Sequence, residues 1–442
     1  MPNSHRPTSA CLHLLKATAT LAGVTLAVLT LLVAGGFAQA QFTTLHAFTG
    51  ATDGLFPYAV SGLVMDRRGN LYGTTFLGGA SSHGVVFKLT QTGSAWISTP
   101  LYSFLGGSDG AYPYAGVTIG PDNALYGATY NGGGSGCGNG CGVIYRVTPP
   151  ISACKSALCP WNETVLYRFT GGADGANPHA GVVFDAAGNL YVTTVQGGSG
   201  FGTVFELARG SGGWTPTLVY SFAGGNDGSA PLASVTLDSA GNLYGTTSTA
   251  GPFDEGTVYK ISPTGAGWTE SVLYSFTGGA DGGEPLGGLV FDSLGNLYGT
   301  ASNGGGNGGV AFAGIRPPIA TGGTAFQLSP AGGGNWTFSL IYTFTGTDNT
   351  GLGPYADMIF GSDGSLYGTA GGGGIPPQLD GTVFKLTPAV GNWTYTSLHE
   401  FTGGADGEDP FGSLIFDSSG NLYGTATYGG ANGYGVVFEI TP

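Results

Sequence analysis

A tripeptide of the form Asn-Leu-Tyr, or a close variant of it, recurs seven times along this chain of 442 residues. Successive copies lie 53 to 56 residues apart, except for two intervals of 65 and 69. A period of this length indicates repeated supersecondary units. The tyrosines are Tyr72, Tyr126, Tyr191, Tyr244, Tyr298, Tyr367 and Tyr423. A phenylalanine that closes a Leu-Tyr-Ser-Phe-like run keeps the same period, at Phe48, Phe104, Phe169, Phe222, Phe276, Phe344 and Phe401.

One copy, residues 234–276, indicates four strands, which we name a to d in chain order. Residues 234–238 and 243–247 are short apolar runs joined by the turn-forming sequence Ser-Ala-Gly-Asn, which predicts a tight hairpin of strands a and b. Residues 256–261 alternate apolar and polar and form strand c, and residues 271–276 form strand d. Residues 41–442 show no sustained apolar period of 3.6 residues, so we expect no helices there.

Four antiparallel strands per copy predict an all-β, seven-bladed β-propeller that spans residues 41–442. This part of the chain opens with a lone d strand, residues 43–48, and ends after strands a, b and c of the seventh copy. We therefore expect the N-terminal strand to complete the last blade and to close the ring, which removes the open sheet edges. The recurring aromatic residues of strands b and c are expected to be core.

The first 40 residues resemble an export signal, with Arg6 and Lys16 ahead of an apolar run at residues 21–33 and a small-residue cleavage motif at residues 38–40. An uncleaved N-terminal anchor is the alternative. Cleavage predicts a secreted or periplasmic protein without a membrane span, which we expect to be a monomer. Residues 41–442 then carry 10 Lys and Arg against 26 Asp and Glu, a formal charge of −16. Such a charge repels phosphate backbones, so nucleic acid is not an expected partner.

The cassette resembles a known bacterial tandem repeat. Leu-Tyr-Ser-Phe-Thr-Gly-Gly-Ala-Asp-Gly, Gly-Leu-Val-Phe-Asp-Ser-x-Gly-Asn-Leu-Tyr-Gly-Thr and Gly-Thr-Val-Phe-Lys-Leu-Thr-Pro follow one another, most clearly at residues 273–301 and 381–388. These motifs are similar to the GloVer repeat of Gloeobacter and Verrucomicrobia. The resemblance implies an exported repeat protein, and it brings no catalytic residues with it. The order of strands is also similar to that of NHL-type propellers.

Four of the five cysteines lie beyond the signal, which predicts disulfides in an exported protein. Cys137 and Cys141 fall in a b-to-c loop, and Cys154 and Cys159 fall in the following c-to-d loop. The strand between the two pairs, residues 142–148, spans about 20 Å, which is too far for a bridge from one loop to the other. We therefore predict the disulfides Cys137–Cys141 and Cys154–Cys159, and the same distance disfavours one zinc site made of all four.

The two ends of the blades are expected to differ. In an antiparallel blade the d-to-a and b-to-c connections lie at one end of the sheet. The long insertions, residues 304–323 and 371–380, both fall in b-to-c connections. Because variable loops on a rigid scaffold commonly carry function, this loop-rich acidic face is the candidate functional face, for a glycan or a protein ligand.

One position just before strand a is expected to lie at the mouth of the central channel. Aromatic residues there suit stacking on sugar rings or holding a peptide. The alternative is that they only pack and plug the mouth. The position holds Tyr58, Tyr114, His179, Leu232, Leu286, Tyr355 and Phe411, of which Tyr58, Tyr114, His179, Tyr355 and Phe411 are the ligand-binding candidates.

Acidic residues that break the repeat are the enzyme candidates. Asp357 stands where other copies have Gly, Ser or Val, and His179 is the accompanying residue to test. A hydrolase or lyase acting on a glycan or a lactone needs two such groups to converge in the channel. The other candidates are loop acids, namely Glu284, Glu408, Asp409, Asp254 and Glu255. For all of these acids the alternative is that they are solvated loop charges.

Two series of aspartates repeat with the cassette. The loop after strand d contains Gly-x-Asp-Gly or a near variant, which suits either a calcium site or an Asp that hydrogen-bonds its own turn. The second series precedes the a-to-b hairpin and is expected to be structural. The first series is Asp53, Asp109, Asp174, Asp227, Asp281, Asp348 and Asp406, and the second is Asp66, Asp185, Asp238, Asp292 and Asp417.

No metal-ligand spacing, nucleophile elbow or phosphate loop stands in a fitting context. The leading hypothesis is therefore a non-enzymatic binding or cell-surface interaction scaffold without a required cofactor. A channel-centred enzyme and a purely structural envelope protein are the alternatives.

Overall fold

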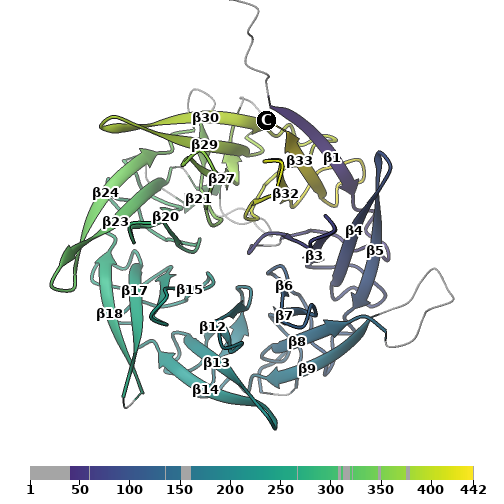
Figure 1. Cartoon of the computed structure of the whole chain (residues 1–442), viewed down its shortest axis with the longest axis horizontal. Coiled ribbons are helices and arrows are strands. Elements are labelled where there is room, and N and C mark those ends of the chain that lie inside the picture. Colours follow the sequence, from purple (N-terminus) through teal and green to yellow (C-terminus); the bar gives the residue numbers. More distant parts are fainter. Residues whose placement is uncertain are drawn as a thin grey trace, which may run out of the picture. The chain divides into compact units, whose positions relative to one another are not determined.

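Seven antiparallel sheets, six of four strands and one of five, stand around a central axis in the computed structural model (Figure 1). The structure describes residues 40–441 except 59, 135, 151–160, 266, 307–309, 312–318, 321, 347–349 and 375–378. Residues 42–441 form one compact unit. The predicted signal segment and the predicted Cys154–Cys159 pair lie outside the described residues. Among the described residues, none belongs to a helix of the length and apolarity that crossing a membrane requires.

Each sheet is one blade, and strand a is innermost. The a strands are β2 (Val64–Met65), β6 (Thr118–Ile119), β11 (Val183–Phe184), β15 (Thr236–Leu237), β19 (Val290–Phe291), β26 (Ile359–Phe360) and β31 (Ile415–Phe416). The b strands are β3 (Leu71–Thr75), β7 (Leu125–Thr129), β12 (Leu190–Gln196), β16 (Leu243–Thr247), β20 (Leu297–Ala301), β27 (Leu366–Ala370) and β32 (Leu422–Ala426).

The two outer strands of each blade are longer. The c strands are β4 (Val85–Thr92), β8 (Val143–Thr148), β13 (Thr203–Gly210), β17 (Thr257–Thr264), β23 (Thr324–Gly332), β29 (Thr382–Ala389) and β33 (Val436–Thr441). The d strands are β5 (Ala95–Ser103), β9 (Asn162–Arg168), β14 (Gly213–Ser221), β18 (Gly267–Ser275), β24 (Asn335–Thr343), β30 (Asn392–Glu400) and β1 (Gln41–Ala47). Numbering the blades by their a strands, blade 1 contains β2 and blade 7 contains β31.

Five short strands belong to the loops. They are β10 (Ala176–Pro178), β21 (Val310–Ala311), β22 (Ile319–Ala320), β25 (Gly351–Leu352) and β28 (Gly372–Gly373). β25 pairs with β28, which joins a d-to-a loop to a b-to-c loop, and β10 joins the corresponding loop of blade 3 to the end of β12. In the other five blades an isolated bridge, such as Leu55 with Leu77, makes the same link. The two kinds of loop therefore lie at the same end of the blades, as predicted.

The first strand of the chain closes the ring. β1 pairs with β33, so blade 7 combines the N-terminal strand with three C-terminal strands, which confirms the predicted closure (Figure 1). The strand begins two residues earlier than predicted, at Gln41, and this brings Phe42 into the blade interface. The Phe42 ring stacks on His399 of blade 6 at 3.8 Å and lies 5.4 Å from Phe438 of its own blade.

The core lies between neighbouring blades. One buried cluster joins Tyr72 and Phe104 of blade 1 to Leu125 and Tyr145 of blade 2, and similar clusters join other neighbouring blades. The phenylalanines that close the d strands are buried in all seven copies. Burying such a ring contributes about 1.5–3 kcal/mol. The recurring aromatics of strands b and c are core, as predicted.

The glycine of the Asn-Leu-Tyr-Gly motif has a steric role. In blade 1, Gly73 of strand b pairs directly with Phe87 of strand c. A Cβ at Gly73 would lie 2.7 Å from the Phe87 ring, so a larger residue would push the ring out of the sheet interface. Blade 3 is the exception, with Val192 opposite Phe205.

The second aspartate series stabilises the a-to-b hairpin. In blade 4, Asp238 accepts hydrogen bonds from the backbone N–H groups of Ala240 and Asn242 and from the side chain of Asn242. Tyr244 of the repeated tripeptide donates its hydroxyl to the same carboxylate at 3.1 Å. These bonds hold the pKa of Asp238 below its usual value against the opposing effect of burial. The same set recurs at Asp66, Asp292 and Asp417.

Candidate functional site

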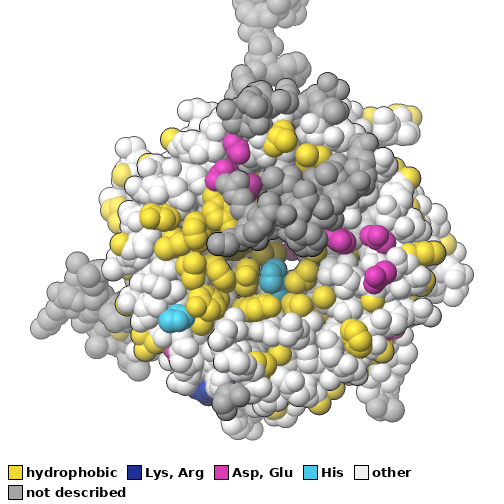
Figure 2. Space-filling view, turned by 180° about the vertical axis from the view of Figure 1, so that it is seen from behind, with side chains coloured by type: hydrophobic (Ala, Val, Ile, Leu, Met, Phe, Trp, Pro, Cys, Tyr) yellow, Lys and Arg dark blue, Asp and Glu magenta, His cyan; other side chains and the backbone are white. Residues whose placement is uncertain are grey.

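The d-to-a and b-to-c loops form one face of the ring, which we call the loop face. No Lys or Arg lies in the described parts of these loops, whereas Asp254, Glu255, Glu284, Asp380 and Glu408 do. Figure 2 shows this side, where apolar side chains gather beside the middle of the ring and acidic side chains lie in groups farther out. An acidic face without cations disfavours anionic ligands.

The predicted aromatic candidates meet at the mouth of the channel. Tyr355 lies 5.1 Å from Phe411, and Phe411 stacks on Tyr58 at 6.2 Å. Tyr58 in turn lies 5.4 Å from Tyr114, whose ring stacks on His179 at 4.7 Å. The chain of rings thus runs through five consecutive blades, from blade 6 through blade 7 to blade 3. Tyr58 and Phe411 are buried, while the other three keep partial solvent exposure.

His179 is held by the next blade. Its Nδ1 donates to the carbonyl of Leu232 at 3.3 Å, so the imidazole continues the mouth series into blade 4. Burial lowers the pKa of His179 to about 4 despite this bond. The ring is therefore neutral at pH 7, with Nε2 as an acceptor.

A strained backbone position recurs beside the mouth. The residue before the proline of each d-to-a loop adopts a positive φ, between 50° and 60° in all seven blades. Glycine tolerates this conformation without strain, but only blade 6 has one. The seven residues, which we call the strained positions, are Phe56, Tyr112, Asn177, Ala230, Glu284, Gly353 and Asp409.

Hydrogen bonds to the preceding blade hold the strained positions in place. Tyr112 N–H donates to the carbonyl of His83 at 2.9 Å, and the matching bond is present in every blade at 2.8–2.9 Å. The bonds fix the backbone and leave the side chain free to vary. Six copies keep a side chain at an energetic cost of about 1 kcal/mol each, which points to a use for those side chains.

Replacing Ala230 by glycine should therefore stabilise the protein. We expect Ala230→Gly to raise the free energy of unfolding by about 0.5–1 kcal/mol, because the strain at φ 54° disappears. Ala240→Gly is the matched control, since Ala240 is exposed in an a-to-b turn and is not at positive φ. It should destabilise by a similar amount. Urea denaturation compares the three proteins, and destabilisation by both changes would contradict the strain argument.

The carbonyls that receive these bonds belong to a second variable series, which the sequence analysis missed. We call them the slot residues, and each precedes the glycine that leads into strand c. Six of the seven have a side chain that packs over a glycine of the next d-to-a loop, where a Cβ would clash. In blade 1, for example, His83 packs over Gly106. The slot residues are His83, Cys141, Phe201, Glu255, Gly322, Asp380 and Tyr434. All seven residue types differ. The sequence contains this variation, but only the shared backbone hydrogen bond shows that the seven positions are equivalent.

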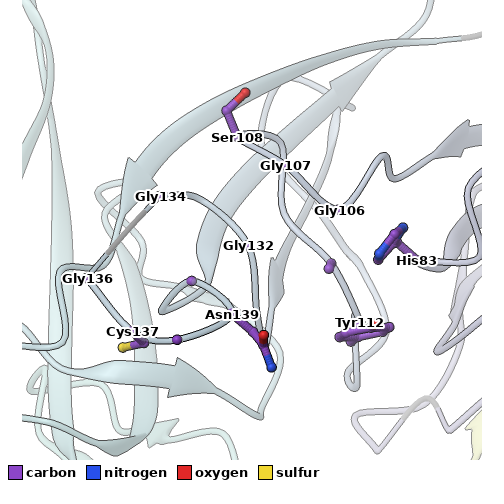
Figure 3. Close-up of a pocket in the computed structure, with 13 residues that line it drawn as sticks. His83, Gly106, Gly107, Ser108, Tyr112, Gly132, Gly134, Gly136, Cys137 and Asn139 are labelled. Atoms are coloured by element: carbon purple, nitrogen blue, oxygen red, sulfur yellow. The ribbon is translucent and has the colours of Figure 1, made fainter.

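A groove between blades 1 and 2 combines these features (Figure 3). Its volume is about 820 Å³. His83 and Tyr112 lie on one side, with ring centroids 5.4 Å apart, and Asn139 and Cys137 lie across from them. Most of the remaining lining is glycine backbone. The groove therefore offers two aromatic rings and peptide donors and acceptors.

The far wall of this groove is the enlarged b-to-c loop of blade 2. The predicted disulfide Cys137–Cys141 is present in it, with Cα atoms 5.1 Å apart. Gly132 N–H donates to the carbonyl of Asn139 at 2.9 Å, and Gly140 N–H donates to that of Cys137 at 3.0 Å. The wall is thus closed on itself by covalent and backbone bonds.

The first aspartate series binds its own turn. Asp174 accepts the hydroxyl of Tyr167 at 3.0 Å and the N–H of Thr170 at 2.8 Å. His46 and His399 replace the tyrosine in front of Asp53 and Asp406. Among the described residues, no three His, Cys, Asp or Glu side chains form a group suited to a metal ion. Asp348 lies outside the described residues.

The acidic enzyme candidates fall into three separate groups, which are Asp357 by itself, Glu284 with Glu255 and Asp254, and Asp409 with Glu408. Asp357 lines a cavity in the channel, and the residues that line this cavity include no other ionisable side chain and not His179. Glu284 belongs to a d-to-a loop, where its N–H donates to the carbonyl of Glu255. Burial raises the pKa of Glu284. Burial also raises the pKa of Glu255, and nearby carboxylates, chiefly that of Glu284, raise it further. Asp409, in the d-to-a loop of blade 7, likewise donates its N–H to the carbonyl of Asp380 in blade 6.

Comparison with known proteins identifies the repeat. A family model described as the Gloeobacter/Verrucomicrobia repeat matches residues 33–162, 139–313 and 319–442. The chain belongs to this family. Family membership agrees with the seven blades, because the matched regions run along nearly the whole ring. No curated protein matches the sequence.

One solved structure with a similar arrangement is a crystal structure of a putative 6-phosphogluconolactonase from Bacteroides uniformis. It shares 14% sequence identity, the alignment covers 80% of this chain and 86% of that one, and the TM-score is 0.46. A match of this quality carries no argument about activity or ligand.

Proposed function

We propose that this member of the Gloeobacter/Verrucomicrobia repeat family is an exported, non-enzymatic binding module that holds a neutral glycan on its loop face. The observation that carries the proposal is the strained series, since six blades keep a side chain where glycine would cost less. These side chains, the slot residues and the aromatic mouth all lie on one face.

The chemistry of the groove between blades 1 and 2 favours a sugar. Tyr112 and His83 supply ring faces for stacking, and the glycine backbone and Asn139 supply hydrogen-bonding groups. The described loops contain no Lys or Arg that would attract an acidic polysaccharide. Catalysis is less well supported, because a hydrolase or lyase needs two convergent groups and the cavity of Asp357 is lined by a single carboxylate.

A glycan array tests the proposal. We expect the wild-type protein to bind a subset of neutral glycans, and the double variant His83→Ala/Tyr112→Gly to bind them at least tenfold more weakly. The substitution at Tyr112 relieves strain, so loss of binding is not explained by backbone damage. Leu294→Ala is the control, because Leu294 is 83% exposed in an a-to-b turn at the other end of blade 5.

Two results would contradict the proposal. One is equal binding of neutral glycans by the double variant and the wild type. The other is that the wild type binds no neutral glycan on the array. Titration calorimetry with the strongest array hit then measures the difference, for which tenfold corresponds to about 1.4 kcal/mol.

A further inference from the structure

Blade 1 contains a short insertion that reaches across the channel. Strand a begins four residues after the mouth residue in blades 2 to 7, as from Tyr114 to Thr118, but six residues after it in blade 1, from Tyr58 to Val64. The longer segment includes Ser61. Its Oγ accepts the N–H of Gly181 in blade 3 at 2.9 Å and lies 3.4 Å from the hydroxyl of Ser234 in blade 4. The segment therefore narrows the channel beneath the aromatic mouth.

Asp357 breaks the repeat at the same level. In blades 2 to 7 the second residue after the mouth residue is Gly116, Gly181, Ser234, Gly288, Asp357 and Ser413, so only blade 6 has a charged side chain there. Asp357 Oδ1 accepts the N–H of Gly288. Asp357 N–H donates to Ser413 Oγ at 3.2 Å, and Ser413 donates to the carbonyl of Val60 at 2.9 Å. Hydrogen bonds thus connect the one charged residue to the one insertion.

The two departures from the repeat line one cavity of about 420 Å³. Its walls are strands β6, β11 and β15 of blades 2, 3 and 4, with Val183, Phe184 and Leu237 as apolar surface. The hydroxyl of Thr118 donates to the carbonyl of Val182, and that of Thr236 donates to Leu289, both at 2.6 Å. The two threonine hydroxyls therefore donate to the protein and not to a ligand. The volume of the cavity lies in the range of small-molecule sites.

A carboxyl in such a place is costly, and burial raises the pKa of Asp357. Packing alone would be served by Gly or Ser, which the other blades have at this position. A bound cation would offset the hydration energy that the carboxylate loses on burial, because the two opposite charges attract each other.

We propose that the channel cavity binds a small organic ammonium ion, with its charged group on Oδ2 of Asp357, since Oδ1 accepts the Gly288 N–H, and its apolar body against Phe184, Val183 and Leu237. This site is separate from the loop face, because none of the mouth residues lines the cavity. It needs no glycan to be present.

The test compares 2-phenylethylammonium with its neutral isostere 2-phenylethanol by titration calorimetry at pH 8. We expect the ammonium ion to bind wild-type protein at least tenfold more tightly than the alcohol. Asp357→Asn keeps an acceptor for Gly288 N–H and replaces the charged carboxylate by a neutral amide, so it should bind the two probes within twofold of each other. Asp357→Ser, which introduces the residue of blades 4 and 7, should do the same.

Three results would overturn the proposal: equal affinity of the wild type for the two probes, an unchanged preference in both variants, or no saturable binding of the ammonium ion at 50 mM. Thermal melts of the variants check folding. If Asp357→Asn does not fold, Asp357→Ser decides. Because the glycan test uses residues of the loop face, either proposal can fail without the other.

Discussion

A chain that begins at residue 49 should fail to form a stable monomeric ring. β1 is the d strand of blade 7, and removing it leaves β33 with an unpaired edge. It also removes the buried Phe48 and the contacts of Phe42 with blade 6. Each lost aromatic contributes about 1.5–3 kcal/mol, so we expect a loss of several kcal/mol. Size-exclusion chromatography with light scattering should show aggregation, and urea denaturation should show a lower midpoint.

A circular permutant provides the control. The permutant begins with residues 49–442, continues with a copy of residues 389–393, and ends with residues 41–48. The copied residues contain the c-to-d turn of blade 6. They give blade 7 the connection that the other blades have. This protein should regain a monomeric ring and a midpoint near that of the wild type. A monomeric truncated chain with an unchanged midpoint would show that closure by β1 is dispensable.

Raising the pH from about 4.5 to about 7 should weaken the fold at two matched sites. Glu163 and Glu270 occupy equivalent positions in the d strands of blades 2 and 4. Burial, followed by the charge of Asp109 for Glu163 and of Asp227 for Glu270, raises the pKa of each carboxyl to about 7.

The sign follows from proton linkage. Between pH 4.5 and 7 the unfolded chain releases these protons and the folded chain keeps them, so stability is fully present below 4.5 and falls until about 7. Both side chains keep some solvent contact, and after allowance for screening we expect a loss on the order of 1 kcal/mol at each site.

Glu163→Gln/Glu270→Gln isolates this contribution, because other carboxyls titrate equally in both proteins. The difference in free energy of unfolding between the double variant and the wild type should grow in favour of the variant as pH rises from 4.5 to 7, and then level off. Urea denaturation across this range measures it. A difference that stays constant with pH would refute the assignment.

The repeat made the architecture predictable. The period and the strand order indicated seven blades, and the lone strand at the start indicated how the ring closes. The aromatic mouth followed from its fixed offset before strand a. The disulfide Cys137–Cys141 followed from the length of the strand that separates the two cysteine pairs.

Other parts of the site depend on contacts between blades. The positive φ of Tyr112 is fixed by its hydrogen bond to His83, a residue 29 positions earlier in another blade. Similarly, the two extra residues before Val64 become informative only when Ser61 is found to contact blades 3 and 4. Because these positions vary from copy to copy, the repeat pattern itself carries no information about them.

The hydrogen bond between each slot residue and the following strained position involves only main-chain atoms. A substitution at either position therefore leaves the donor and the acceptor of this bond in place. Under the proposed glycan binding, a change of ligand preference needs substitutions only where two neighbouring blades meet, while the other five blades keep the ring intact. Apart from Cys141, which is held in a disulfide, the slot and strained positions form a rim at which side chains can be randomised in directed evolution while the main-chain bonds between blades remain.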